Sequence, residues 1–385
     1  MHIICTLREK SFKAGGLMKK GIALALSGGG YRAMAFHAGV CRYLAEAHGL
    51  DSVKFISTVS GGSLFAGYVI SQAGMKWPSS DDYLKTSYPA VRDLLTSYDL
   101  QLAALARLAF RITNWPHIFS RANIIAQALK EDLKIDCTLY DLPISPEWSI
   151  NGTTAETGKR IRFKFDEVGE YSLGYAQARN FPLASAMAAS AAFPVGIGPY
   201  SLPTRKYQWV KRPWKAPMSE AKVVKLPYRR LRIYDGGVYD NLGLEPIFDN
   251  GILKTKVDAS IVASDAGAPL KEGFNLGTLN PFRVKRILDI ATDQNRSLRV
   301  RSLHGHLDIA KTGACIWIGD KPNPGNDAST KHTTSYGRDC LTSLERQHVR
   351  SYPTNLSQMR PEDFDLIAQH GYEAAQWAHR LRPFA

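Results

Sequence analysis

The chain has 385 residues, of which 44% are hydrophobic and 22% are charged, and these proportions exclude a disordered chain, a collagen and a coiled coil. Lys and Arg number 49 against 35 Asp and Glu, and the formal net charge of +14 favours polyanionic surroundings: nucleic acid, an acidic substrate or an anionic membrane face. The five cysteines form no CxxC pair, which predicts reduced thiols in a reducing, cytoplasmic compartment.

The N-terminal segment 1–17 carries basic residues but no convincing signal peptide, and we expect it to be a disordered extension before Met18. No stretch approaches the roughly 18 apolar residues of a membrane-spanning helix. Residues 18–385 contain no internal repeat and no clean linker, which predicts a single domain.

The first elements after Met18 form a repeated pattern. The short apolar run 21–26 (GIALAL) predicts a buried strand, three glycines interrupt it, and residues 31–47 have the spacing of a helix. A second strand at 53–58 then leads through another glycine pair into a helix at 63–73. This repeat of strand, glycine turn and helix predicts an α/β fold with a parallel sheet.

The remaining elements are predicted in the same way. Residues 80–135 have a helical pattern, and within them 100–119 is an apolar and basic segment that suits a lid, a membrane-contacting helix or a core helix. Residues 320–340 predict a mobile loop. The other expected elements are two strands within 145–165, a helix at 183–192, an insertion at 201–230, strands at 231–234, 257–263 and within 308–319, and helices at 281–303 and 361–382.

Ser60 is the first candidate for chemistry. A β-branched strand delivers it into Gly61-Gly62, where a helix opens, and a nucleophilic serine on a tight turn needs this arrangement. The amides at the start of the helix add positive partial charge near the hydroxyl. A serine here is also a favoured N-cap, and that alternative remains open.

The second candidate is the loop Ser27-Gly28-Gly29-Gly30-Tyr31-Arg32. Consecutive glycines let backbone amides converge on an anion, which in acyl transfer is the tetrahedral oxyanion. Phosphate binding fits less well because there is no GxxxxGK[ST] and no ribose-binding acid after the second strand. A tight turn without chemistry is the remaining alternative.

The third candidate is Asp235, followed by Gly236-Gly237 at the end of a strand. A carboxylate in this position suits a general base, although an Asx-turn explains Asp before Gly equally well. No histidine has a comparable context. His37 falls inside the first helix, and His304 and His306, which alternate as on a strand, lack a third metal ligand nearby. A Ser60–Asp235 dyad without histidine is therefore the sharper hypothesis.

The motifs SGGGYR, STVSGGS and DGG, in this order, resemble the patatin-like phospholipase family. Residues 150–154 with 157–158, residues 189–194 and residues 235–241 are similar to further blocks of that family. The resemblance implies a three-layer α/β/α fold with a mostly parallel central sheet, in which Ser60 is the nucleophile and Asp235 its base. It also implies that Gly28, Gly29 and Gly30 form an oxyanion hole that Arg32 supports. Thr58, Gly61 and Gly62 would form the nucleophile elbow, in which the family usually has glycine at the position of Thr58. A second departure is Ala33, which follows Arg32 where the family often has glycine.

The insertion at 201–232 holds ten Lys or Arg and one acid. Aromatic residues are interleaved with these charges, and this combination suits docking on anionic headgroups. We therefore predict a membrane-binding surface, although nucleic-acid binding or a solvated loop fits the same composition. The residues expected to form this surface are Trp209, Lys211, Arg212, Trp214 and Lys215.

The sequence as a whole predicts a serine lipid acyl hydrolase of the phospholipase A or lysophospholipase type, peripheral on a membrane, acting on phospholipid without a metal, a cofactor or obligatory nucleic acid. An acyltransferase or thioesterase with the same dyad is one alternative. A non-catalytic protein that binds membranes or nucleic acid through its basic surface is the other. No oligomeric state is predicted.

Overall fold

The computed structural model describes residues 21–194, 196–213, 216, 218–267, 269–270, 272–274, 282–320 and 340–384. The expected extension 1–17, most of the expected loop 320–340, and the two positions Trp214 and Lys215 lie outside these residues.

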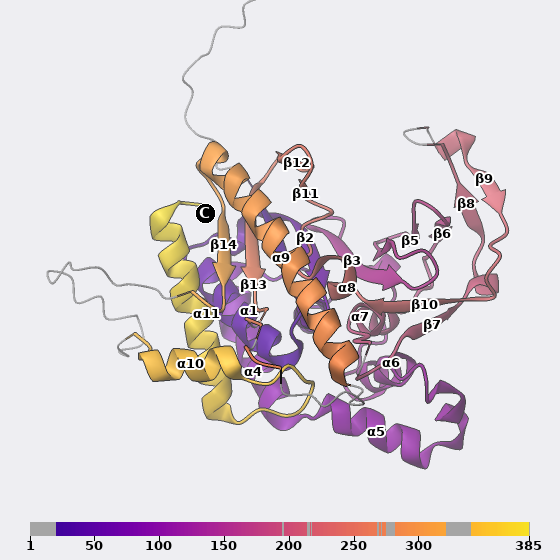
Figure 1. Ribbon diagram of the computed structural model, residues 1–385, viewed down its shortest axis with the longest axis horizontal. Coiled ribbons are helices and arrows are strands. Elements are labelled where there is room, and N and C mark those ends of the chain that lie inside the picture. Colours follow the sequence, from indigo (N-terminus) through magenta and orange to yellow (C-terminus); the bar gives the residue numbers. More distant parts are fainter. Residues whose placement is uncertain are drawn as a thin grey trace, which may run out of the picture.

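The sheet that carries the site begins with five parallel strands (Figure 1). Their order is β14-β13-β1-β2-β3, and every neighbouring pair is parallel. β1 is wholly apolar, and β1, β2 and β13 are almost wholly buried, as parallel strands covered on both faces should be. Their bounds are β1 Ile22–Leu26, β2 Val53–Val59, β3 Glu147–Thr154, β13 Ser260–Asp265 and β14 Ala314–Trp317.

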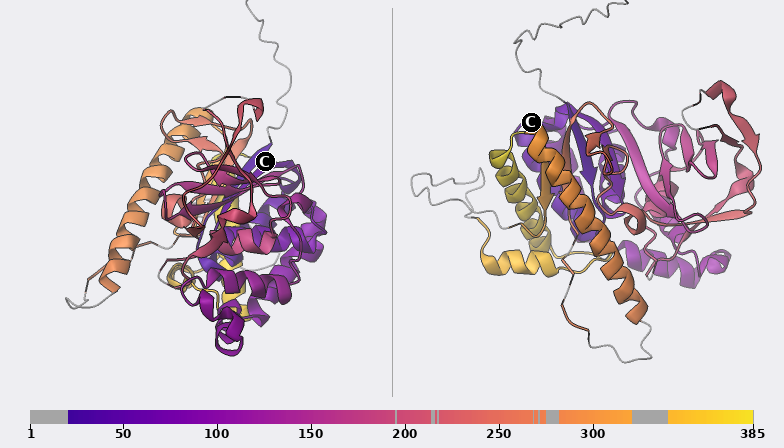
Figure 2. Two further views of the ribbon diagram at one scale, coloured as in Figure 1. Left: turned by 90° about the vertical axis from the view of Figure 1, so that its right-hand side faces the viewer. Right: turned by 45° about the horizontal axis from the view of Figure 1, so that its top comes forward.

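Alternate residues of β1 separate two hydrophobic clusters, one on each face of the sheet. Ile22, Leu24 and Leu26 pack in the larger cluster, which includes the apolar residues of α1, α2 and α11. Ala23 and Ala25 pack in the smaller one, together with residues of α9 and of the segment 242–248. Helices therefore cover both faces, and the predicted three-layer α/β/α arrangement is confirmed (Figure 2).

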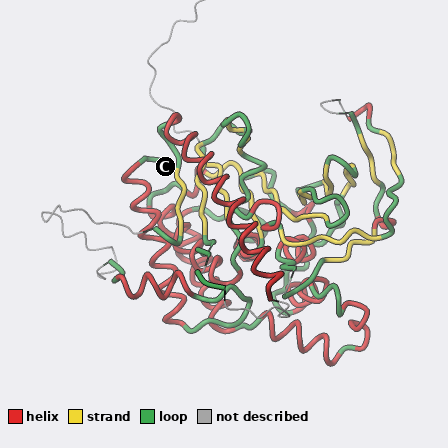
Figure 3. Tube along the Cα trace, in the orientation of Figure 1, coloured by secondary structure: helices red, strands yellow, loops and turns green. Residues whose placement is uncertain are grey.

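Beyond β3 the sheet continues with antiparallel pairs only. One branch runs from β3 through β4, β5, β6 and β8 to β9, and β10 pairs with β3 and β7 off this path (Figure 3). The parallel part and the two strands around Gly158, β3 and β4, were predicted, whereas the rest of this antiparallel extension was not. Its strands are β4 Arg160–Phe163, β5 Glu167–Glu170, β6 Gly174–Gln177, β7 Tyr200–Pro203, β8 Trp209–Lys211, β9 Lys222–Val224 and β10 Arg230–Asp235, and a separate pair is β11 Phe248–Asp249 and β12 Lys254–Thr255.

The described helices surround this sheet (Figure 1). The prediction that His304 and His306 alternate on a strand is wrong, because α9 continues to Ala310 and β14 begins only at Ala314. In the described part of the chain no helix is both long enough and apolar enough to cross a bilayer. The helices are α1 Gly30–Glu46, α2 Gly61–Gln72, α3 Ser80–Asp82, α4 Tyr88–Ser97, α5 Leu100–Phe110, α6 Ala122–Glu131, α7 Leu183–Ser190, α8 Gly237–Asp240, α9 Phe282–Ala310, α10 Ser343–Ser351 and α11 Pro361–Leu381.

Candidate active site

Ser60 occupies the sharp turn between β2 and α2. Its backbone has φ 51° and ψ −119°, a conformation that a residue with a side chain rarely adopts. The side chain makes no capping hydrogen bond to α2, so the N-cap alternative does not account for the serine. The turn is held by the Ser60 amide, which donates to Ser190 Oγ at 3.0 Å.

Buried hydroxyl groups support this turn from behind. Ser190 Oγ, at the end of α7, donates to the Asn151 carbonyl at 2.6 Å and lies 2.8 Å from Ser63 Oγ. Ser63 Oγ in turn lies 2.7 Å from Thr58 Oγ1. The threonine that replaces the glycine usual in the elbow is thus accommodated, because its hydroxyl joins this buried network.

The register of three strands brings Ser60 and Asp235 together. Val59 pairs with Asn151 across β2 and β3, and the next residue, Gly152, pairs with Asp235 across β3 and β10. The ends of β2 and β10 therefore meet at neighbouring residues of β3, and this pairing brings Ser60 close to Asp235. The Ser60 hydroxyl lies close enough to the Asp235 carboxylate to lower its pKa.

Asp235 has a buried carboxylate that no cation contacts among the described residues. The residue is 4% exposed, and the Gly237 amide donates to its Oδ1 at 2.7 Å. Burial raises the pKa of Asp235 to about 6, although the Ser60 hydroxyl and the Gly237 amide oppose that rise. A carboxylate with a pKa near neutrality is a stronger proton acceptor than an exposed aspartate and is still ionised at pH 7.

The glycine loop lies directly against Ser60. A Cβ on Gly28 would stand 2.9 Å from the Ser60 Cβ and 2.6 Å from Asn241 Oδ1, so only glycine fits. The Gly28 amide donates to the Asn241 carbonyl at 3.2 Å and is not available to a substrate. The amides of Gly29 and Gly30 have no acceptor among the residues that the structure describes.

Arg32 fastens this loop to two distant parts of the chain. Its Nη1 donates to the Tyr352 carbonyl at 2.7 Å and its Nη2 to the Ala266 carbonyl at 3.1 Å. Burial lowers the pKa of Arg32 to about 10, while Asp265 partly offsets that effect. Arg32 therefore remains charged at neutral pH and holds the loop through its fork of N–H groups.

Gly61 and Gly62 allow the start of α2 to lie against the first motif. A Cβ on Gly61 would overlap the Gly30 carbonyl oxygen, and one on Gly62 would overlap the Leu26 carbonyl oxygen. Both predicted glycine motifs are thus in contact, although about thirty residues separate them in the sequence.

The expected membrane-binding residues lie elsewhere. None of the described ones lines the cavity at the dyad. Trp209 is 3% exposed and its indole donates to the Thr204 carbonyl at 3.0 Å, so its expected place at the surface is wrong: the ring packs in the core. Lys211 is exposed and donates to the Ser172 carbonyl, and Arg212 is exposed.

A cavity of about 1250 Å³ opens at the dyad. Ser60, Asp235 and the glycine loop form part of its wall. Sequence reasoning missed most of the rest, which comes from α5, α6, α9, α10 and the segment 352–356, because nothing local marks these residues as neighbours of Ser60. The volume exceeds the span usual for small-molecule pockets and suits a ligand with a long chain.

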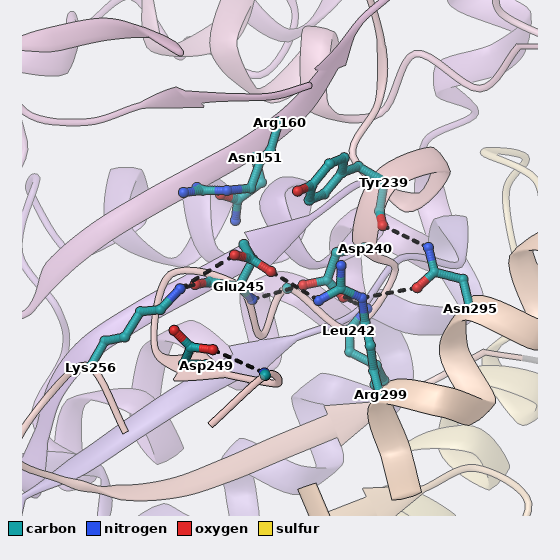
Figure 4. A network of polar contacts seen from close by, with 12 residues as sticks. Asn151, Arg160, Tyr239, Asp240, Leu242, Glu245, Asp249, Lys256, Asn295 and Arg299 are labelled. Carbon is teal, nitrogen blue, oxygen red and sulfur yellow. Dashed lines mark hydrogen bonds and ion pairs between the residues drawn. The ribbon is translucent and has the colours of Figure 1, made fainter. Parts of the chain in front are cut away.

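Helix α9 is anchored to the segment that follows Asp235 (Figure 4). Asn295 Nδ2 donates to the Tyr239 carbonyl at 2.9 Å, and Arg299 Nη1 pairs with Glu245 at 3.1 Å. Asp240 accepts from the Leu242 amide at 3.1 Å and so shapes the same loop. These contacts hold the α9 side of the cavity in place relative to the dyad.

The remaining polar candidates have structural places. His37 is buried between Ser264 and the Ser27 carbonyl, and burial lowers its pKa to about 4, so it is a packed neutral residue as expected. Cys41, Cys137 and Cys315 are free thiols. Within the described ranges no group of three or more His, Cys, Asp or Glu side chains is arranged to hold a metal ion.

Comparison with known proteins places the chain in a family. The model of the patatin-like phospholipases matches residues 24–248, more than half of the chain. The structure of human GIVD cytosolic phospholipase A2 aligns with a TM-score of 0.49 and 14% sequence identity, and the alignment covers 94% of this chain and 61% of the human chain. VipD from Legionella pneumophila aligns with a TM-score of 0.33 and 15% identity, covering 94% of this chain and 67% of the VipD chain. No curated protein matches in sequence. The family model, with its motifs set in a three-layer α/β fold, shows that the chain belongs to the patatin-like phospholipases.

Proposed function

We propose that the chain is a serine lipid acyl hydrolase of the phospholipase A or lysophospholipase type, with Ser60 as nucleophile and Asp235 as its base. The observation that carries this proposal is that Ser60, on its strained turn, and the buried Asp235 carboxylate lie beside each other in the wall of one large cavity. Membership of the family supports the lipid ester as substrate class.

The mechanism follows from this geometry. Asp235 accepts the Ser60 proton while the hydroxyl oxygen attacks the ester carbonyl, and the carbonyl electrons move onto its oxygen. When the tetrahedral intermediate collapses, the ester C–O bond breaks and the leaving alcohol takes the proton from Asp235. Water then attacks the acyl-enzyme, Asp235 again accepts a proton, and the fatty acid leaves as Ser60 is regenerated.

The oxyanion of each tetrahedral intermediate needs donors that are not already occupied. The amides of Gly29 and Gly30 meet that condition, and Gly61, which follows the nucleophile, contributes the third amide. Gly28 then serves as the close-packed wall rather than as a donor. Arg32 is a positioning residue, because its guanidinium holds the loop through Tyr352 and Ala266.

The proposed site of action is a membrane surface that the chain contacts peripherally. Exposed apolar side chains of α5 and the following residues 112–119 support this, since Leu105 belongs both to this surface and to the cavity wall. A lipid could pass from the bilayer into the cavity along that wall. The exposed large apolar residues are Leu102, Leu105, Phe110, Ile112, Trp115, Ile118 and Phe119.

The test is Ser60→Ala, with Ser71→Ala on the same helix α2 as its matched control. We expect Ser60→Ala to lower release of fatty acid from a phospholipid by at least about 10³-fold and to abolish labelling by a fluorophosphonate probe. Ser71→Ala should keep both, because Ser71 lies at the far end of α2 and outside the cavity wall. Equal hydrolysis by Ser60→Ala and the unaltered chain would refute the proposed enzyme.

A further inference from the structure

The wall of the cavity carries apolar, cationic and acidic side chains. Apolar residues come from several elements, among them Leu105 of α5, Ile125 of α6 and Leu288 of α9. Most of the cations come from α9 and α10, which form the cationic end of the wall, and the acids Asp289, Asp293 and Asp320 also line the cavity. In Figure 1 α5 and α6 lie at the lower right, α10 lies at the lower left, and the first turns of α9 lie between them.

Two arginines of α10 form the core of the cationic end. Arg346 and Arg350 are four residues apart, so both side chains project from one face of the helix, and both line the cavity. Arg346 donates to the Leu341 carbonyl. The Arg350 guanidinium lies 5.9 Å from the centroid of the Trp317 ring, and its Nε is shielded from solvent without an acceptor among the described residues.

These two charges lack ion pairs of the kind that two cavity cations of α9 form. Arg296 pairs with buried Asp265 at 2.7 Å, and Lys285 pairs with Asp289 at 2.6 Å. Neither Arg346 nor Arg350 forms an ion pair within the described part of the chain. Burial is the main cause that lowers the pKa of His370, and the positive charges of Arg346 and Arg350 both lower it further. The two arginines therefore act on the same region of the protein.

We infer that Arg346 and Arg350 form a subsite for a phosphate anion that is attached to the acyl substrate. The inference rests on the proposed function and extends it, since it names the chemistry at the non-acyl end of the substrate. Two neighbouring guanidinium forks match the oxygens of a phosphate, and two like charges on one helix face are stabilised when an anion lies between them. The family model ends at residue 248, so this subsite belongs to the part of the chain that the model does not match.

The phosphate has two sources that share this chemistry. It is the headgroup phosphate of a glycerophospholipid or lysophospholipid, or it belongs to the carrier of an acyl thioester such as acyl coenzyme A. Substrates with one common oleoyl chain separate these sources: lysophosphatidylglycerol, oleoyl coenzyme A and uncharged monooleoylglycerol, each below its critical micelle concentration so that membrane docking does not contribute.

The experiment compares Arg346→Gln/Arg350→Gln with the unaltered chain and with Arg301→Gln. Arg301 is an exposed residue of α9 outside the cavity wall, so its substitution removes charge without touching the subsite. We expect the double variant to raise KM for a phosphate-bearing substrate by about 10-fold or more, with kcat little changed. For monooleoylglycerol, the kcat/KM of the double variant should stay within about twofold of that of the unaltered chain. The kcat and KM of Arg301→Gln should stay within about twofold for every substrate.

A binding measurement separates this inference from the proposed hydrolysis. Lysophosphatidylglycerol and oleoyl coenzyme A are titrated calorimetrically into Ser60→Ala, with and without the two arginine substitutions. Loss of affinity for either compound supports the subsite and names the source of the phosphate. Unchanged affinity for both, or an equal loss of kcat/KM for the charged and the uncharged substrates, overturns it. Failure of every substrate to turn over, with arginine-dependent binding intact, would refute only the hydrolase.

Discussion

At the scale of single residues, the contrast between Asp235 and Asp265 shows how this fold tunes a carboxylate. Both are buried, but Asp265 has Arg296 beside it, whereas Asp235 has the Ser60 hydroxyl and the Gly237 amide beside it. Burial without a nearby cation raises the pKa of Asp235 to about 6. Ionisation of Asp235, the proposed base, therefore lowers the free energy of unfolding of the protein.

The pH dependence of catalysis follows from that pKa. The proposed base must be ionised, so kcat/KM should be level above pH 7 and fall towards tenfold per pH unit below about 6, as Asp235 becomes protonated. The measurement is a pH profile of kcat/KM on a short-chain ester whose own charge is constant between pH 4.5 and 8.5. A profile level down to pH 4.5 would contradict the assignment of Asp235 as the base.

Asp235→Asn should abolish activity and still stabilise the protein. The native pKa of about 6 lies above the ordinary value of 3.8, so ionisation favours the unfolded chain. Ionisation of Asp235 destabilises the folded chain fully above about pH 7 and not at all below about pH 4. Asp235→Asn removes this destabilisation, so above about pH 7 it should raise the free energy of unfolding by about 1–3 kcal/mol. Urea unfolding at pH 8 and pH 5 tests this. A variant that is no more stable than the unaltered chain at pH 8 would contradict the uncompensated burial.

At the scale of elements, two candidate membrane surfaces lie far apart. The predicted one, on the insertion, extends along β8 and β9, while the apolar one lies on α5 and residues 112–119 (Figure 1). Phe110 and Phe119 are each 86% exposed, and α5 supplies part of the cavity wall. Trp209 is buried, which leaves Lys211 and Arg212 as the described charges of the predicted surface.

We expect Phe110→Ser/Phe119→Ser to weaken binding to phosphatidylglycerol vesicles by about 10-fold or more, because both rings lose their burial in the interface. Hydrolysis of a soluble short-chain ester should be retained, since neither residue lines the cavity. The parallel variant Lys211→Gln/Arg212→Gln should weaken vesicle binding only modestly and mainly at low salt. A cosedimentation assay measures both. Loss confined to the Lys211 and Arg212 variant would assign docking to the insertion.

At the scale of the whole molecule, the first and last helices cross with unusually close backbones. A Cβ on Gly39 of α1 would overlap the Ala368 carbonyl oxygen of α11, and one on Gly371 would overlap the Phe36 carbonyl oxygen. The C-terminal part also supplies the Tyr352 carbonyl that Arg32 binds. This packing joins α1 to α11, and it links the site to a part of the chain beyond the family match.

Gly39→Ala should destabilise the protein by about 2 kcal/mol or more, because the added methyl group forces α1 and α11 apart. The matched control is Gly305→Ala in α9, where a Cβ would lie 3.9 Å from its nearest neighbour, Leu253 Cδ1. There, alanine should stabilise by up to about 1 kcal/mol through its helix propensity. Urea unfolding measures both, and equal effects at the two glycines would contradict the close crossing.

The local features of this protein were predictable from its amino-acid sequence. The buried strands β1 and β2, their glycine turns and the helices that follow were predictable, because apolar periodicity and glycine act within a few residues. Ser60, the glycine loop and Asp235 could be singled out for the same reason. The serine on the turn is recognisable from its neighbours alone.

Which of these residues meet depends on contacts between distant parts of the chain. Asp235 reaches Ser60 because β10 pairs antiparallel to β3 at Gly152, whereas the sequence suggested a parallel edge. The same applies to Trp209, whose burial depends on packing against the main core. It also applies to Arg346 and Arg350, which become cavity residues only when α10 packs against α11. Strand register and helix docking bring together residues tens to hundreds of positions apart, and no local pattern encodes those contacts.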